Sequence, residues 1–170
     1  KDYKIVLNNN DLNKIINILH NADLIAFDFD SDPVSGLPED NFQVRWTGLI
    51  HAEVSGQYEF RTESDDGVSL YINDNLIIDQ WIDQGTTSWT SSINLAAGLH
   101  NLVLEYYEND GGANCYLYWT PPGQGESLVR PAGSMVSNFS VEDFVDSVFY
   151  DHQFVSPSWS HPNLYMNANY

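Results

Sequence analysis

Apolar and polar residues alternate along the middle of the chain. In residues 56–62 and again in 68–72, side chains suited to a buried face occupy every second position. A period of two is typical of a strand with one buried face. Polar turn residues separate such segments, which we expect at residues 3–7, 24–27, 42–46, 49–52, 56–62, 68–72, 76–81, 88–95, 99–107 and 114–119.

The spacing of these segments predicts the fold class. Parallel strands need long crossover connections, and the turns in this sequence are too short for them. We therefore predict an all-β fold, an antiparallel β-sandwich or barrel. One or two short peripheral helices complete it, because residues 12–19 place apolar side chains on one helical face. Ser140-Val-Glu-Asp143 also has the form of a capping box that opens a helix through Val148.

The alternating pattern ends at Pro121-Pro122-Gly123. We predict a sandwich domain over residues 1–122 and a C-terminal extension over residues 123–170, and leave open whether the extension packs on the same domain. A chain of 170 residues can bury one core of ordinary size without a disulfide scaffold. The single cysteine, Cys115, is therefore predicted to be a buried thiol.

The charge balance limits the possible partners. The chain carries 24 acidic and 6 basic residues, a net charge of -18. This charge repels phosphate backbones and anionic lipids, so we expect neither nucleic acid nor membrane insertion. It attracts divalent cations, although a solvated acidic surface accounts for most of these residues. The chain has no apolar run of about 20 residues and no basic-then-apolar leader, and we expect a mature piece of a larger multidomain chain.

The pair Asp65-Asp66, followed by Gly67, is the strongest candidate for chemistry. It lies in a tight loop between two predicted strands, where a bent backbone, which Gly67 helps to permit, can turn both carboxylates toward one point. Converging carboxylates repel unless a cation lies between them, and oxygen-only ligands favour calcium. The alternative is a capped turn in which the acids accept backbone N–H groups.

A second acidic run, Asp28-Phe-Asp-Ser-Asp32, has acids at every second residue, with Glu39 eleven places after Asp28. This spacing imitates the ligands of a helix-loop-helix calcium loop. Pro33 replaces the glycine that such a loop needs, and Pro38 interrupts the expected exit helix. We favour a solvated turn over a second calcium site.

Six segments between residues 36 and 122 follow one another in a recognisable order. They are Gly36-Leu-Pro-Glu-Asp-Asn-Phe-Gln-Val-Arg-Trp-Thr-Gly48, Ser55-Gly-Gln-Tyr-Glu-Phe60, Ser64-Asp-Asp-Gly-Val68, Asp79-Gln-Trp81, Gly98-Leu-His-Asn-Leu-Val-Leu-Glu-Tyr-Tyr107 and Tyr116-Leu-Tyr-Trp119. Together they resemble the PA14 domain, a family named after a fragment of the anthrax protective antigen. The resemblance implies a β-sandwich like those of toxins, bacterial glycosidases, adhesins and yeast flocculins. It also implies a non-catalytic role, usually carbohydrate binding.

The resemblance further implies a set of ligands. In lectin-active members, aspartates at the positions of Asp65 and Asp66 are joined by a cis peptide and bind calcium. A later loop supplies an asparagine side chain, here Asn109, and backbone carbonyls, here near Gly111 and Ala113. Calcium takes 6–8 oxygens, so such a site leaves positions open for sugar hydroxyls.

Three further residues are candidate sugar contacts. Asp110 lies in the same loop as Asn109, although Asn-Asp-Gly-Gly is also a good turn without a ligand. Trp81 and Tyr107 could stack on a sugar ring, but both alternate with core positions, so packing is the favoured alternative.

The sequence shows no features of an enzyme site. It lacks a Gly-x-Ser-x-Gly elbow, a phosphate-cradling loop and a Cys/His nucleophile pairing, and nothing places two carboxylates on opposite sides of a cleft. We expect a non-catalytic, calcium-dependent carbohydrate-binding or adhesion module of a secreted or cell-surface protein. The alternative is a structural or protein-interaction accessory domain of a larger toxin, surface protein or glycosidase.

Overall fold

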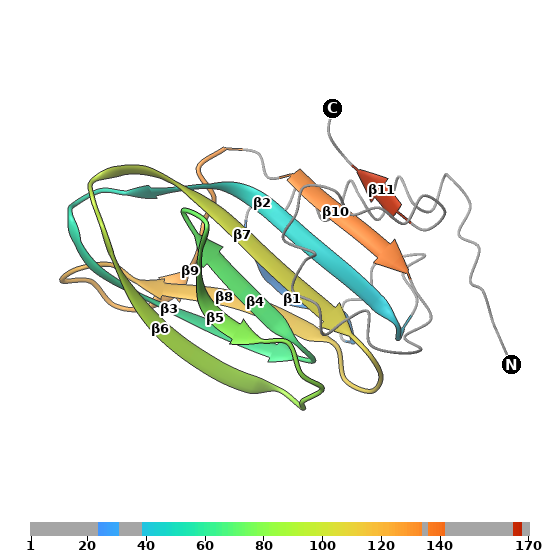
Figure 1. The fold of residues 1–170 in the computed structure, drawn as a ribbon. Helices are drawn as coiled ribbons and strands as arrows, with labels where there is room; N and C mark the ends of the chain where they lie inside the picture. Colours follow the sequence, from blue (N-terminus) through green and yellow to red (C-terminus); the bar gives the residue numbers. More distant parts are fainter. Residues whose placement is uncertain (1–23, 31–38, 134–135, 142–164, 168–170) are drawn as a thin grey trace, which may run out of the picture.

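The computed structural model describes residues 24–30, 39–133, 136–141 and 165–167, and these form antiparallel strands in two facing sheets (Figure 1). This arrangement confirms the predicted all-β sandwich. The strands are β1 (Ala26–Asp28), β2 (Phe42–Ala52), β3 (Gly56–Asp65), β4 (Val68–Ile72), β5 (Asn75–Gln80), β6 (Thr87–Leu95), β7 (Gly98–Glu108), β8 (Asn114–Thr120), β9 (Ser127–Leu128), β10 (Val136–Val141) and β11 (Tyr165–Asn167).

The strand order separates the chain into two layers. One sheet has the order β1-β8-β3-β6, with β9 also paired to β8. The other has the order β11-β10-β2-β7-β4-β5. Strands β9 and β10 follow residue 122, so the segment beyond the predicted sandwich domain pairs with both sheets.

Aromatic side chains fill the space between the sheets. Trp46 and Tyr106 come from one sheet and Phe60 from the other, and each is fully buried. Such side chains bury roughly 150–250 Å² each, which makes them large contributors to folding. Cys115 lies in the same core as a free thiol, as predicted.

Most predicted strands are present, with two differences that affect the candidate site. The segments predicted at 42–46 and 49–52 form one continuous strand, β2, because the intervening residues keep their pairing with β7. Strands β3 and β7 extend further than predicted, to Asp65 and Glu108. Both acids are therefore held by sheet pairing rather than by a loose loop.

The helix predicted from Ser140 through Val148 is tested only at its first two residues. Ser140 and Val141 belong to β10, which pairs with Phe42 and Gln43 of β2, so the helix does not start there. Residues 142–148 lie outside the described residues. A capping box is a local signal, and here the backbone groups along the edge of β2 provide the competing partners. The helix at 12–19 and the strand at 3–7 lie outside the described residues. No helix within the described ranges is long and apolar enough to cross a membrane.

Three connections cross from one sheet to the other at the same end of the sandwich. They are the turn between β3 and β4, the β5–β6 segment over residues 81–86, and the β7–β8 segment over residues 109–113. The pairings of Asp65 with Asn114, Ser64 with Thr87 and Val68 with Gln80 hold these connections together. The fold thus gathers three loops at one edge.

Candidate functional site

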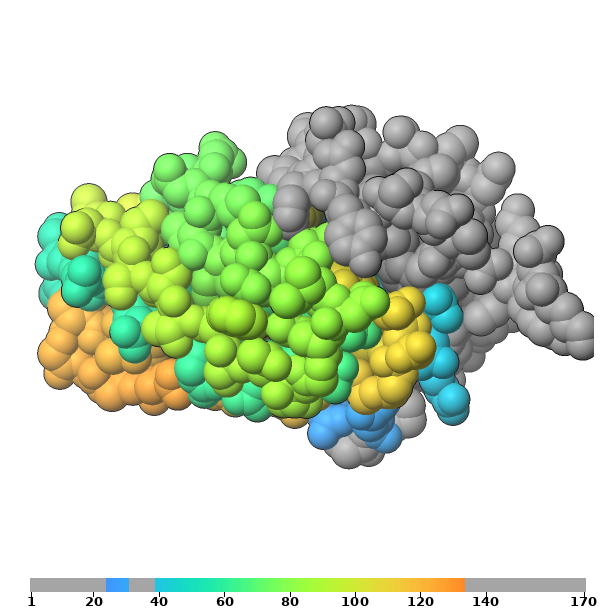
Figure 2. All heavy atoms as spheres, turned by 60° about the horizontal axis from the view of Figure 1, so that its bottom comes forward, coloured from blue at the N-terminus to red at the C-terminus, as the bar shows by residue number. Residues whose placement is uncertain are grey.

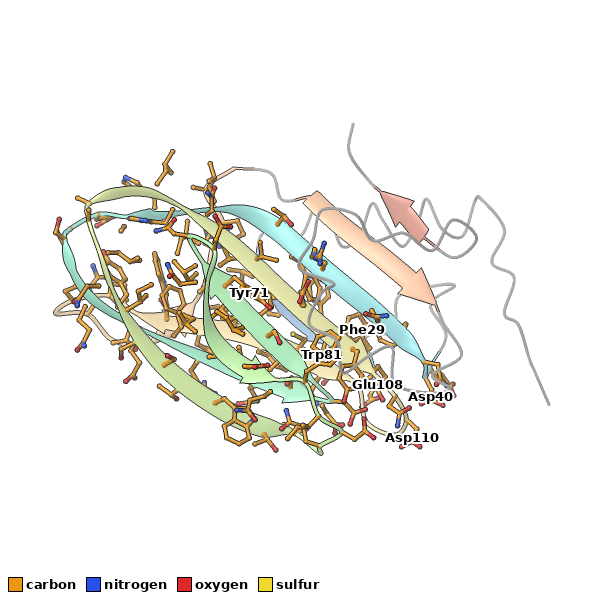
Figure 3. The ribbon with its side chains drawn as sticks, in the orientation of Figure 1. Phe29, Asp40, Tyr71, Trp81, Glu108 and Asp110 are labelled. Atoms are coloured by element: carbon orange, nitrogen blue, oxygen red, sulfur yellow. The ribbon has the colours of Figure 1, made fainter. Side chains whose placement is uncertain are left out.

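The three crossing loops form a continuous surface at one end of the molecule. Figure 2 shows the β7–β8 segment in yellow, next to the green segment after β5, the cyan residues near Asp40 and the blue residues around β1. Figure 3 places Glu108, Asp40 and Asp110 at this same end of the sandwich. The acidic residues that the sequence separates are therefore neighbours in the fold.

The pair Asp65-Asp66 lies at the centre of this end. The peptide bond between the two residues is cis, as the resemblance implies. Asp65 is half-buried, whereas Asp66 is only 4% exposed. One carboxyl oxygen from each, together with one from Glu108, lie within 4.8 Å of one another. Three acidic side chains thus converge on one point.

Backbone N–H groups from two other loops orient the pair. Oδ1 of Asp66 accepts from the Gln84 amide at 2.8 Å, and its Oδ2 accepts from the Asn109 amide at 2.9 Å. Oδ2 of Asp65 accepts from the Thr86 amide at 3.1 Å. The capped-turn alternative is therefore present in part. A carboxylate oxygen has two lone pairs, so one hydrogen bond leaves each oxygen able to bind a cation.

Glu108 lies beneath the pair, fully buried. Its Oε2 is 3.0 Å from the hydroxyl of Tyr106, which also donates to the Asp65 carbonyl at 2.6 Å. Its Oε1 has no hydrogen-bond partner among the described residues. Burial, and then the negative charge of Asp66, raise the pKa of Glu108 to about 9.

The pKa values of Asp65 and Asp66 are also raised. Burial is the main cause that raises the pKa of Asp65, and nearby Asp30 and Asp110 add to it. Burial also raises the pKa of Asp66, with Asp65 among the smaller contributors. Acids whose neighbours are acids become easier to ionise when a cation is bound between them. The site therefore has the charge that a cation would balance.

The β7–β8 loop, which carries the other predicted ligands, lies next to the pair: the Asn109 amide donates to Asp66, and a Cβ on Gly112 would lie 3.0 Å from Oδ2 of Asp65. Asn109 is half-buried, and its side-chain amide is 3.4 Å from Asp83. The amide of Gly111 donates to Asp40 at 3.2 Å. The carbonyl of Ala113 already accepts from the Phe29 amide at 2.9 Å, which leaves one lone pair on that oxygen for a cation.

Trp81 and Tyr107 occupy packing positions. They are 4% and 2% exposed, and their ring centroids are 4.8 Å apart. The hydroxyl of Tyr107 donates to Asp83 at 2.8 Å, and the ring lies where a Cβ on Gly67 would be. Sugar stacking needs an exposed ring face, and neither side chain has one in this structure. The two rings instead support the turn after Asp66.

The structure adds residues that the sequence analysis did not place here. Glu108 could have been found, because it is two positions after the core residue Tyr106 and the period of a strand puts both on the inner face. Asp30 accepts from the Ala113 amide at 3.0 Å. Asp30 is part of the acidic run 28–32, which imitates a calcium loop, and it thus joins the same site as Asp65. Of the other two acids in that run, Asp28 belongs to β1 and Asp32 lies outside the described residues.

A family model places this geometry in context. The model described as "PA14 domain" matches residues 3–133, well over half of the chain. The chain belongs to the PA14 domain family. The resemblance drawn from the sequence motifs is confirmed.

Proteins of two kinds are similar to this PA14 domain. The anti-sigma-I factor RsgI3 of Acetivibrio thermocellus is 30% identical over 143 residues, which cover 76% of this chain and 22% of that protein. The present chain thus spans about a fifth of that relative. An anti-sigma factor domain-containing protein from Clostridium clariflavum is 32% identical with a TM-score of 0.60, over 66% of this chain and 39% of the other.

The second kind is an adhesin of Candida glabrata. The epithelial adhesin 9 A domain, solved in complex with Galβ1-3GlcNAc, has a TM-score of 0.53 over 72% of this chain and 70% of its own. The identity is 12%, so this likeness concerns the fold.

Proposed function

We propose that this PA14 domain is a calcium-dependent carbohydrate-binding module of a secreted or cell-surface protein, with no catalytic activity of its own. The observation that carries the proposal is the convergence of one carboxyl oxygen from Asp65 and one from Asp66 within 4.8 Å of each other. Carboxylates held this close repel one another, and a bound cation removes that repulsion. The carboxyl oxygens of this cluster meet at one point, whereas in a glycosidase site two carboxylates face each other across a substrate.

The donor set favours calcium. All the candidate ligands are oxygens, and calcium prefers 6–8 of them in flexible geometry. Asp65 and Asp66 would bind through carboxylates, Asn109 through its side-chain carbonyl, and Gly111 and Ala113 through backbone carbonyls. The backbone N–H groups that meet Asp65 and Asp66 would fix the orientation of these ligands, as outer hydrogen bonds do in many metal sites.

Carbohydrate is the ligand class that suits the exposed side of the site. A cation with open positions can bind two neighbouring hydroxyls of a sugar. Asp30, Asp83 and Asp110 are exposed around it and could accept hydrogen bonds from further hydroxyls. The adhesin with the same fold was solved with a disaccharide, which supports this choice although its identity is low.

The relatives support a larger parent protein. This chain matches only 22% of the Acetivibrio thermocellus protein and 39% of the Clostridium clariflavum chain. We infer that the domain is one part of a multidomain protein and lies outside the cell, where glycans are available. Their anti-sigma factor names favour a second candidate function, an accessory domain that contacts protein rather than sugar.

A glycan array separates the two functions. The array is probed with the domain in millimolar calcium and again in excess chelator, alongside the Asp65→Asn/Asp66→Asn double variant. The proposal predicts binding that both the chelator and the double variant remove. Asp74→Asn, an exposed acid in the β4–β5 turn, serves as the matched control and should bind as the wild type does. Binding of no glycan would favour the accessory role, and glycan binding that survives chelation would overturn the calcium dependence.

A further inference from the structure

We infer that Glu108 is a third carboxylate ligand of the cation, so that the ion is bound by the interior of the sandwich as well as by its loops. The inference rests on the proposed function, because it concerns the same site. It assigns a role to a residue at the end of β7 that carries no calcium-ligand role in the sequence motifs.

The distances permit a shared ion. Calcium–oxygen bonds are about 2.3–2.6 Å, so two oxygens bound to one ion lie at most about 5 Å apart. The three carboxyl oxygens of Asp65, Asp66 and Glu108 all lie within 4.8 Å of one another. Every pair in the cluster therefore meets this limit.

The hydrogen bonds of Glu108 leave one oxygen for the ion. Tyr106 has a single hydroxyl proton, and its closer acceptor is the Asp65 carbonyl at 2.6 Å rather than Glu108 Oε2 at 3.0 Å. Glu108 Oε1 is buried and has no hydrogen-bond partner within the described part of the chain. A buried carboxyl oxygen without a partner is costly, and coordination to a cation would satisfy it.

The third carboxylate changes what the site can hold. Three carboxylates around one divalent cation leave the cluster with a net negative charge, which favours a strongly charged ion over a monovalent one. Glu108 contacts the ion from the buried side, so the exposed positions stay open for sugar hydroxyls. We therefore expect Glu108 to set the affinity for the metal, while the loops set the choice of sugar.

Calcium titration of three proteins tests this role. Isothermal titration calorimetry is performed on metal-free wild type, Glu108→Gln and Glu59→Gln. The glutamine at 108 keeps the size of the side chain and removes its charge, whereas Glu59 is an exposed acid of β3 outside the cluster. We expect Glu108→Gln to raise the calcium Kd by at least tenfold and Glu59→Gln to leave it within twofold.

The outcomes distinguish this inference from the proposed function. Wild type that binds no calcium overturns both. If the wild type binds calcium and Glu108→Gln has the same calcium Kd, only the role of Glu108 is overturned. Glu108→Asp, which keeps the charge on a shorter side chain, should bind more weakly than wild type and more tightly than Glu108→Gln. Melting in chelator completes the test, since a purely structural role predicts a lower Tm for Glu108→Gln without metal, and a ligand role predicts an equal or higher one.

Discussion

Two polar turns at opposite ends of β4 show what separates the candidate site from a simple connection. Asn73-Asp74-Asn75 joins β4 to β5, with positive φ at Asn73 and Asp74. Asn75 donates to the Ile72 and Asn73 carbonyls, and Oδ1 of Asn73 accepts from the Asn101 amide of the adjacent strand β7. All three turn residues are exposed, and the turn needs nothing more to be stable.

The turn Asp65-Asp66-Gly67 is also short and acidic, but it crosses between the sheets. Asp66 is buried, two neighbouring loops donate to the pair, and a third carboxylate lies beneath it. The difference teaches that acids in a turn become candidate metal ligands only where the fold buries them and brings them together. The local sequence is similar in the two turns, and the surrounding structure decides which turn brings acids together.

The largest expected effect concerns the calcium dependence of the two turns. Calcium at a hundred times its Kd should stabilise the wild type by about 2.7 kcal/mol. For a chain of this size that corresponds to a rise in Tm of roughly 5–10 °C. Asp65→Asn/Asp66→Asn should show no rise, and thermal melts with calcium and with chelator measure it. A double variant that still responds like wild type would place the metal elsewhere.

Packing beneath the first turn gives the next effect. A Cβ on Gly67 would overlap the ring of Tyr107, whereas Gly85, in the neighbouring β5–β6 loop, has no atom within 4 Å of such a Cβ. Gly67→Ala should therefore lower the free energy of unfolding by about 1–3 kcal/mol through overpacking. Gly85→Ala should change it by less than about 0.5 kcal/mol. Urea unfolding of both variants tests the contrast, and equal stabilities would contradict it.

The pH dependence of stability gives a smaller and more specific effect. Burial raises the pKa of Glu108 to about 9, so between its ordinary pKa of 4.5 and pH 9 the folded state holds a proton that the unfolded state has lost. The free energy of unfolding in chelator should therefore fall as pH rises through this range, and below it the contribution is fully present. Glu108→Gln should reduce the slope. This account of the site would be refuted if the free energy of unfolding rose between pH 5 and pH 9 in the wild type but not in Glu108→Gln.

The smallest effect is expected in the second turn. Asp74→Asn changes an exposed acid whose neighbours satisfy the turn without it. Its stability and its response to calcium should match wild type within about 0.5 kcal/mol. A loss of calcium response in this variant would show that net charge, rather than the buried cluster, controls the metal.

The sequence predicts the strands and the acidic pair for physical reasons. Alternation reports which face of a strand is buried, and this locates β3 and β4 on either side of Asp65 and Asp66. Glu108 was missed because the predicted strand stopped at residue 107, one residue short. Asp30 and Asp40 reach the site through loop packing between distant segments, which periodicity does not encode.

The two aromatic candidates and Ser140 show the same limit from opposite sides. For Trp81 and Tyr107 the sequence favours packing, because both alternate with core positions, and their ring centroids lie 4.8 Å apart in the structure. Ser140 begins a plausible helix locally, yet the edge of β2 recruits it into a strand. A local helix signal is overridden where a strand distant in sequence offers more backbone hydrogen bonds.

Calorimetric titration of the metal-free domain with calcium tests the central claim most directly. The account predicts saturable binding of one ion per chain in the wild type, and no binding in Asp65→Asn/Asp66→Asn. A wild-type titration that shows no calcium binding at millimolar concentration would contradict it.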